Sequence, residues 1–201
     1  MCLVCQNEIN NTITKLTICP NVTDTQLFEL SLSGRLDSLR ELYCWDCASL
    51  QTLPLFPNLQ KLDCGWCERL QTLPNFPNLR ELYCRNCTGL QTFPLLPNLR
   101  ILYCGYCTGL QTLPIFPNLQ ILHCWECTGL QTLPLLPNLQ ELNCRGWWMP
   151  QYYLLYIRAW TDESFRKGMY TLCQVWKTWN TKRKKIRAVL PLPKVLLEKI
   201  I

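Results

Sequence analysis

Cysteines are the residues of this chain whose types and spacing could most readily do chemistry, since they make up 15 of 201 residues. Most occur as C-x-x-C pairs that recur at a fixed interval: Cys44/Cys47, Cys64/Cys67, Cys84/Cys87, Cys104/Cys107 and Cys124/Cys127. The 16 residues between Cys47 and Cys64 fit a C-x₂-C-x₁₅₋₂₀-C-x₂-C metal template. Zinc ligation, disulfide bonding and a role in packing are therefore all to be weighed.

The packing role is favoured over zinc. The first cysteine of each pair falls at a position expected to face inward, and the second falls at the following turn, where its side chain can hydrogen-bond the backbone. A free cysteine packs as a small apolar residue with a weak S–H donor, which suits both positions. A tetrahedral site would require four thiolates to leave the core, and the single histidine, His123, cannot complete a Cys₂His₂ set. We expect no metal and no cofactor.

Disulfides are the remaining alternative, because stacked cysteines on neighbouring coils would lie within bridging distance. The opening segment MCLVCQNEINNT has no basic start and no apolar run typical of a signal peptide. No stretch approaches 18 consecutive apolar residues, so no membrane span is expected. These features favour a reducing, cytoplasmic location with free thiols.

The interval between the cysteine pairs is part of a 20-residue repeat. Residues 59–78 read LQKLDCGWCERLQTLPNFPN, four further units begin at Leu39, Leu79, Leu99 and Leu119, and a sixth begins at Leu139 and ends after Gly146. A fixed period of this length indicates a solenoid, in which each unit buries its apolar side chains by stacking on its neighbours.

Each unit is expected to contain one short strand. The segment Leu82-Tyr83-Cys84 alternates with period 2, which predicts that Leu82 and Cys84 face the core and Tyr83 faces outward. Pro94 and Pro97 fix φ and remove backbone donors, so the return limb should be extended rather than helical.

The skeleton L-x-x-L-x-C-x-x-C-x-x-L-x-x-L-P-x-(L/F)-P-N resembles the leucine-rich repeat, in the short form found in bacterial effectors and in large DNA viruses of amoebae. The resemblance covers residues 39–146. It implies an α/β repeat fold that is mostly β, a leucine-rich-repeat solenoid with a parallel sheet on its concave face. It also implies a non-catalytic scaffold that binds a protein partner, host or viral.

Three regions follow from the repeat boundaries. Residues 1–38 retain fragments of the template at irregular spacing, within 13–21 and 27–32, and are expected to form degenerate N-terminal capping coils. Residues 39–146 form the solenoid. Residues 147–201 begin with the aromatic segment WWMPQYYLLYIRAW, expected to cover the last coil, and continue as an amphipathic helix that ends at Pro191.

Positions that vary between repeats identify the expected binding surface. They lie on the predicted concave strand and the turn after it, and are rich in the residue types that dominate protein interfaces. The candidate partner-binding residues are Tyr43, Trp45, Trp66, Tyr83, Arg85, Tyr103, Tyr106, His123 and Trp125. The alternative is neutral drift after duplication, which would not favour large aromatics on a water-facing sheet.

The C-terminal region carries the positive charge. Residues 147–201 contain 11 Lys and Arg against 3 Asp and Glu, whereas the whole chain has a formal charge of +6. A basic patch is formed by Lys182, Arg183, Lys184 and Lys185. It can act in nuclear import, in binding nucleic acid or another anionic surface, in calmodulin-like capture, or only as the solvated end of a helix.

Two alternatives to the interaction scaffold remain open. Residues 192–201 resemble the opening L-P-x-x-(L/V)-L-x-x-I of an F-box, which implies a truncated adaptor for a ubiquitin ligase. Aromatic strips and a basic tail would also suit a structural component of a large viral particle. An enzyme is not expected, because no glycine-rich phosphate loop occurs and no cysteine stands apart from the period as a nucleophile.

Overall fold

The structure is a computed structural model that describes residues 2–6, 8–130, 133–134 and 136–144. The expected aromatic cap, basic helix and F-box-like segment, residues 147–201, lie outside the described residues, as does the end of the sixth repeat at 145–146.

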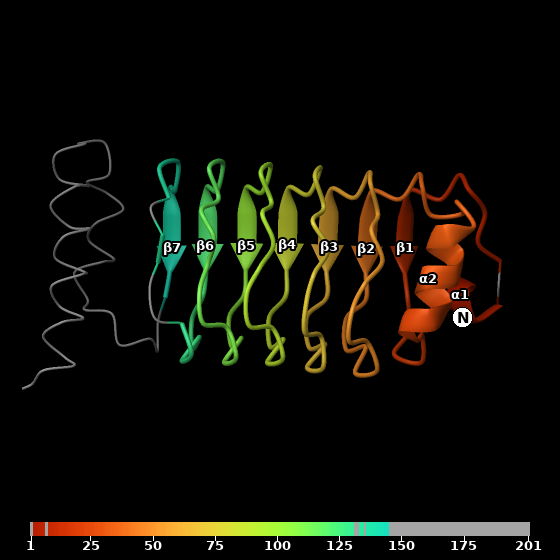
Figure 1. Cartoon of the computed structure of the whole chain (residues 1–201), viewed down its shortest axis with the longest axis horizontal. Coiled ribbons are helices and arrows are strands. Elements are labelled where there is room, and N and C mark those ends of the chain that lie inside the picture. Colours follow the sequence, from red (N-terminus) through yellow and green to blue (C-terminus); the bar gives the residue numbers. More distant parts are fainter. Residues whose placement is uncertain (1, 7, 131–132, 135, 145–201) are drawn as a thin grey trace, which may run out of the picture. The chain divides into compact units, whose positions relative to one another are not determined.

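Parallel strands form a single sheet in chain order, each pairing with the next (Figure 1). The strands are β1 (Lys15–Thr17), β2 (Glu41–Tyr43), β3 (Lys61–Asp63), β4 (Glu81–Tyr83), β5 (Ile101–Tyr103), β6 (Ile121–His123) and β7 (Glu141–Asn143). From β2 onward the register advances by one repeat per strand, so that Leu62 pairs with Leu82 and Leu82 with Leu102. The solenoid predicted from the period is confirmed, as is the parallel sheet that the resemblance to leucine-rich repeats implies.

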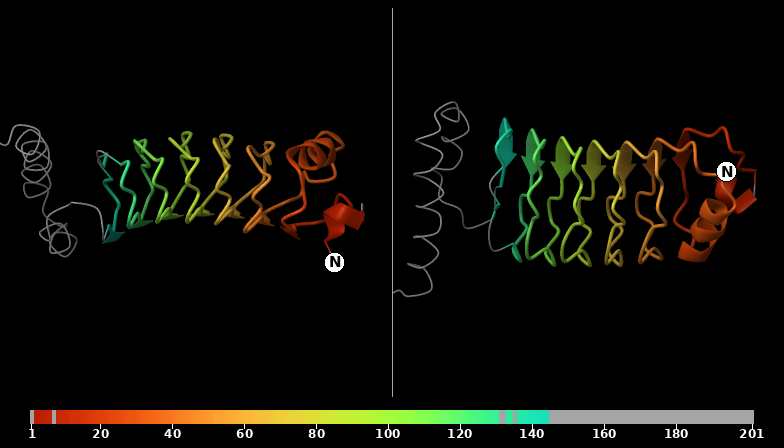
Figure 2. Two further views of the ribbon diagram at one scale, coloured as in Figure 1. Left: turned by 90° about the horizontal axis from the view of Figure 1, so that it is seen from below. Right: turned by 45° about the horizontal axis from the view of Figure 1, so that its top comes forward.

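The strands lie along one side of the coils, and the row of strands is gently curved with the sheet on its inner side (Figure 2). The middle residue of every strand is buried and its two neighbours are not. Leu82 and Cys84 are fully buried, whereas Tyr83 is half-buried. The predicted inward and outward faces of the strand are therefore confirmed.

The return limbs contain no helix in the described repeats, as the prolines require. An asparagine ladder holds successive limbs together. The Nδ2 group of each asparagine donates a hydrogen bond to the backbone carbonyl oxygen 21 residues earlier, at an N–O distance of 2.7–2.9 Å. The donors are Asn58, Asn78, Asn98, Asn118 and Asn138. Because prolines leave these limbs with few backbone donors, the side-chain amides supply the missing hydrogen bonds between coils.

The N-terminal end differs from the expected degenerate coils. β1 pairs with β2 and provides the first coil, but the limb that follows is a helix, α2 (Asp24–Leu32), and a second helix, α1 (Leu3–Gln6), precedes it. Thr23 and Gln26 form a capping box at the start of α2. Without a proline between residues 24 and 32, this limb can adopt the helix that the repeats exclude. Across the described part of the chain, the helices are all too short or too polar to cross a membrane.

Candidate functional site

The second cysteines of the repeats connect adjacent coils. Each donates its S–H group to the backbone carbonyl of the first cysteine of the preceding repeat, at 2.9–3.0 Å, for Cys67, Cys87, Cys107 and Cys127. This agrees with the predicted role of a donor to turn backbone. The acceptor lies one coil away, so the thiols fasten the repeats to each other.

The first cysteines are packed in the core. Burial, followed by interactions with neighbouring thiols, raises the pKa of Cys84 and of Cys124 well above the ordinary value. A thiol held protonated in this way is a poor nucleophile and a poor metal ligand. The first cysteines of the repeats are therefore suited to packing.

On the solvent-facing, concave side of the sheet, the first column consists of charged and aliphatic side chains. Lys61 forms an ion pair with Glu81 at 3.1 Å and lies 5.1 Å from the ring centroid of Tyr83. The hydrogen bond to Glu81 raises the pKa of Lys61. Nearer the N-terminus, Tyr43 donates to Glu41 at 2.9 Å, and this bond lowers the pKa of the Glu41 carboxyl.

The next column holds a continuous aromatic run. Tyr83 meets Tyr103 edge to face, with ring centroids 5.0 Å apart, and Tyr103 stacks on His123 at 4.2 Å with the rings nearly parallel. His123 contacts Trp125 at 5.6 Å, and its Nε2 lies 2.7 Å from Glu141 Oε1. The four side chains are half-buried, because they cover one another as well as the strands.

The third column alternates large and small residues: Trp45, Gly65, Arg85, Gly105 and Trp125. The indole of Trp125 lies over Gly105, where a Cβ atom would overlap the ring, and Trp45 lies over Gly65. The glycines thus give the tryptophans a flat backbone surface on which to lie.

The residue after this column leaves the strand through the left-handed region. Asp46, Trp66, Asn86, Tyr106 and Glu126 all have φ between 56° and 64°. The backbone N–H groups of the first four still bond to the next coil, as Trp66 does to the Arg85 carbonyl at 2.7 Å. Asn and Asp tolerate this conformation, but an aromatic side chain does so at a cost of about 1–2 kcal/mol. Trp66 and Tyr106 are thereby directed to solvent and remain exposed.

Arg85 lies close to both Tyr106 and Trp125. Its guanidinium lies 5.4 Å from the ring centroid of Tyr106 and 5.6 Å from that of Trp125. The structure therefore brings together Tyr83, Arg85, Tyr103, Tyr106, His123 and Trp125, which we call the aromatic cluster. Tyr43, Trp45 and Trp66 lie nearer the N-terminal coils, with Lys15 4.9 Å from the Tyr43 ring centroid.

Sequence reasoning placed these residues on one face but missed two features of it. The pairing of tryptophan with glycine between adjacent repeats is visible as alternation in the third column. The left-handed turn has no such signal, because Trp66 and Tyr106 occupy a position where Gly, Asn or Asp would be the usual indication. The basic patch Lys182, Arg183, Lys184 and Lys185 lies outside the described residues.

No protein-family model matches the chain, and no curated protein is similar to it in sequence. Two solved structures share features of its fold. The leucine-rich repeat domain of the type III effector XopL has a TM-score of 0.43 and 22% identity, over 68% of this chain and 70% of that one. A leucine-rich repeat protein of T. pallidum has a TM-score of 0.43 and 15% identity, over 75% and 84%.

Structural similarity this low gives no information about the partner or the function of this chain. Similarity to viral repeat proteins and the F-box-like onset stay predictions. The chain's own geometry shows a parallel solenoid built from 20-residue coils. An aromatic and cationic cluster lies on the solvent-facing side of its sheet.

Proposed function

We propose that this protein is a non-catalytic scaffold that binds a protein partner on the concave face of its sheet, through the aromatic cluster. Tyr, Trp and Arg are the residue types that supply most of the binding energy at protein interfaces. Here they are contiguous across three repeats and rest on a rigid sheet, so they lose little conformational freedom on binding.

One observation carries the proposal: aromatic side chains occupy strained backbone positions. The turn position accepts Asn at residue 86 and Asp at residue 46, which fit the left-handed region better. Trp66 nevertheless stays 42% exposed and Tyr106 40% exposed. Contact with another molecule would bury the exposed part of these two rings.

The charges around the cluster indicate what kind of surface the partner presents. Arg85 is exposed, and the ion pair of Lys61 with Glu81 is partly accessible. A partner with an apolar centre and acidic groups at its edge would complement this arrangement.

The proposal is tested by affinity capture from a cell extract with the full chain as bait. A matched bait carries Tyr83→Ala and Tyr103→Ala, which remove two outward rings and leave the buried leucines intact. We expect a captured protein to be lost from the matched bait. Equal capture by both baits would contradict a role for the concave face.

A further inference from the structure

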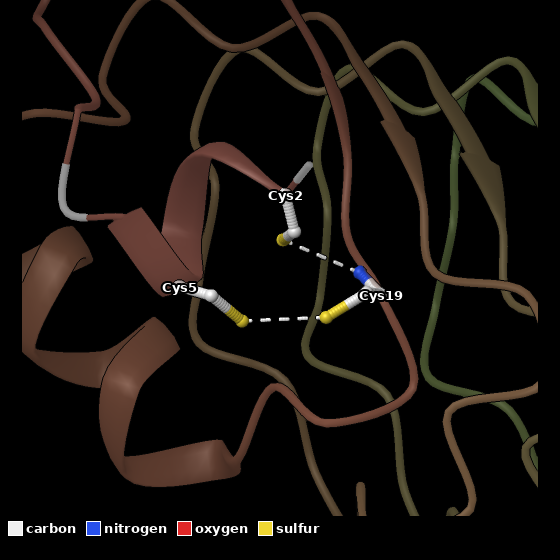
Figure 3. Close-up of side chains that lie close together, drawn as sticks. All are labelled: Cys2, Cys5 and Cys19. Carbon is white, nitrogen blue, oxygen red and sulfur yellow. Dashed lines mark hydrogen bonds between the residues drawn. The ribbon is translucent and has the colours of Figure 1, made fainter.

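Three cysteines of the N-terminal end converge on one point, although none belongs to the repeat. Cys2 precedes α1, Cys5 lies within it, and Cys19 follows β1 (Figure 3). Their Sγ atoms all lie within 4.8 Å of one another, and those of Cys5 and Cys19 are 3.3 Å apart. Among the described residues, these three side chains have ligand atoms close enough together to bind one metal ion.

These thiols differ from the repeat cysteines in their surroundings. Cys44 to Cys127 in the pairs are buried, whereas Cys5 is exposed and Cys2 and Cys19 are partly so. Solvent and ions can therefore reach the cluster. The backbone N–H of Cys19 points at the Sγ atom of Cys2, 3.4 Å away, as a donor to a ligating thiolate would.

The sulfur geometry fits a metal–thiolate centre. With metal–sulfur bonds of about 2.3 Å, the sulfurs of a trigonal or tetrahedral site lie roughly 3.8–4.0 Å apart. Starting from 3.3 Å between Cys5 and Cys19 and from at most 4.8 Å for the other pairs, changes of less than about an ångström in these distances would reach that spacing. Cys2 and Cys5 are three residues apart at a helical turn, which places both on one side of it.

We propose that Cys2, Cys5 and Cys19 bind one thiophilic cation with a filled d shell, Zn²⁺ or Cu⁺, which ties α1 to the first coil of the solenoid. Soft thiolate ligands select these two ions. With three protein ligands, Cu⁺ would be trigonal, and Zn²⁺ would take a water as its fourth ligand. Binding forms three metal–sulfur bonds and releases thiol protons to solvent, with no change in oxidation state.

Such a tie would serve the exposed end of the solenoid. A helix of four residues has little stability by itself, and α1 contributes one buried apolar side chain, Val4. Cys19 is already part of the solenoid, since its carbonyl accepts from the Val22 N–H at 3.1 Å and lies 3.4 Å from the Cys47 thiol. The cation would therefore connect a weakly held segment to a firmly held one.

The test is metal titration of the full chain, reduced and free of oxygen, with Zn²⁺ and separately with Cu⁺. Cys5→Ser removes the exposed ligand without disturbing the core. Cys87→Ser is the matched control, because it removes a repeat thiol and keeps a hydroxyl donor for the Cys64 carbonyl. X-ray absorption of the loaded protein counts the sulfur ligands, and hydrogen exchange follows residues 2–6.

We expect one ion per chain, three sulfur ligands, and slower exchange in residues 2–6 once metal is bound. Cys5→Ser should weaken binding by more than the 10- to 100-fold that outer-shell changes typically cost, and Cys87→Ser should bind as the parent does. Equal binding by the parent and Cys5→Ser would overturn the proposal. So would loss of binding in Cys87→Ser, fewer than three sulfurs, or a Cys5–Cys19 disulfide that the reductant does not open.

Discussion

The thiol of Cys87 donates a hydrogen bond of 2.9 Å to the backbone carbonyl of Cys64, one coil earlier in the solenoid. Both residues are fully buried, so water cannot satisfy that carbonyl if the donor is removed. The two cysteines of the repeated C-x-x-C motif thus have different roles. The first fills the apolar core, and the second donates a hydrogen bond to the preceding coil.

These different roles predict that serine is the less destabilising replacement at the second position and alanine at the first. At residue 87, Cys87→Ala removes the shorter of two hydrogen bonds to the buried Cys64 carbonyl, which keeps the bond from the Cys67 N–H at 3.4 Å. The loss should cost about 0.5–1.5 kcal/mol of unfolding free energy, whereas Cys87→Ser should cost less. At residue 84, Cys84→Ala should be the milder change, because serine buries a hydroxyl in an apolar column. Urea unfolding measures both pairs, and the same ranking at both positions would contradict the assignment.

The leucine columns should account for most of the stability. Leu82→Ala or Leu102→Ala leaves a cavity between fully buried neighbours and should cost about 2–5 kcal/mol. Tyr83→Ala should cost far less, roughly 0.5–1.5 kcal/mol, since it removes an edge-to-face contact on a half-buried ring. Urea titrations that placed Tyr83→Ala above Leu82→Ala would show that the two faces of the strand are misassigned.

Gly105 should be needed for the position of Trp125. A Cβ atom in Gly105→Ala would overlap the indole, which must then rotate away from Arg85 and His123. Tryptophan fluorescence should change. Gly65→Ala is the matched control, because its Cβ would lie 3.1 Å from Trp45 Cδ1, a contact that a small shift relieves. Equal spectral changes in the two variants would argue against the packing of Trp125 on Gly105.

The left-handed turns predict that two aromatic residues can be replaced with little loss of stability. Trp66→Asn and Tyr106→Asn place a tolerated residue where φ is 64° and 61°, so relief of about 1–2 kcal/mol of strain should offset most of the burial that is lost with each ring. The reverse change, Asn86→Trp, introduces the strain and should not stabilise the chain. Thermal unfolding of the three variants is the measurement; a loss of stability in Trp66→Asn as large as that expected of Leu82→Ala would remove the argument from strain.

The sequence was informative wherever a feature recurs with the period. The inward Leu82 and Cys84, the outward Tyr83 and the extended proline limbs all follow from comparing one repeat with the next, and the structure confirms them. The limb after β1 was expected to be a degenerate coil and is the helix α2 instead, because local capping by Thr23 and Gln26 prevails over weak similarity to the repeat.

Features that depend on chain folding outside the period could not be predicted in this way. Cys2 and Cys5 have the C-x-x-C spacing of the repeat pairs, but the sequence does not indicate that Cys19 lies beside them; the three are brought together by the chain between α1 and β1. The contact of Arg85 with both Tyr106 and Trp125 likewise depends on the left-handed turn, which redirects the side chain at residue 106.

The basic patch should affect association more than complex lifetime. Neutralising Lys182, Arg183, Lys184 and Lys185 to Gln should lower the association rate of a captured acidic partner and reduce its dependence on salt. Surface plasmon resonance at two ionic strengths separates the rates. An unchanged association rate would leave the patch without a part in binding.

The central claim is that the concave aromatic cluster holds the partner. It is tested most directly by the dissociation constant of the captured protein for the parent chain and for Tyr106→Asn, a variant expected to fold with little loss of stability. The account predicts binding weakened by about 2 kcal/mol or more, roughly 30-fold, as for a hot-spot residue, with a much smaller change in unfolding free energy. Unchanged affinity in this variant and in the Tyr83→Ala, Tyr103→Ala double variant would contradict it.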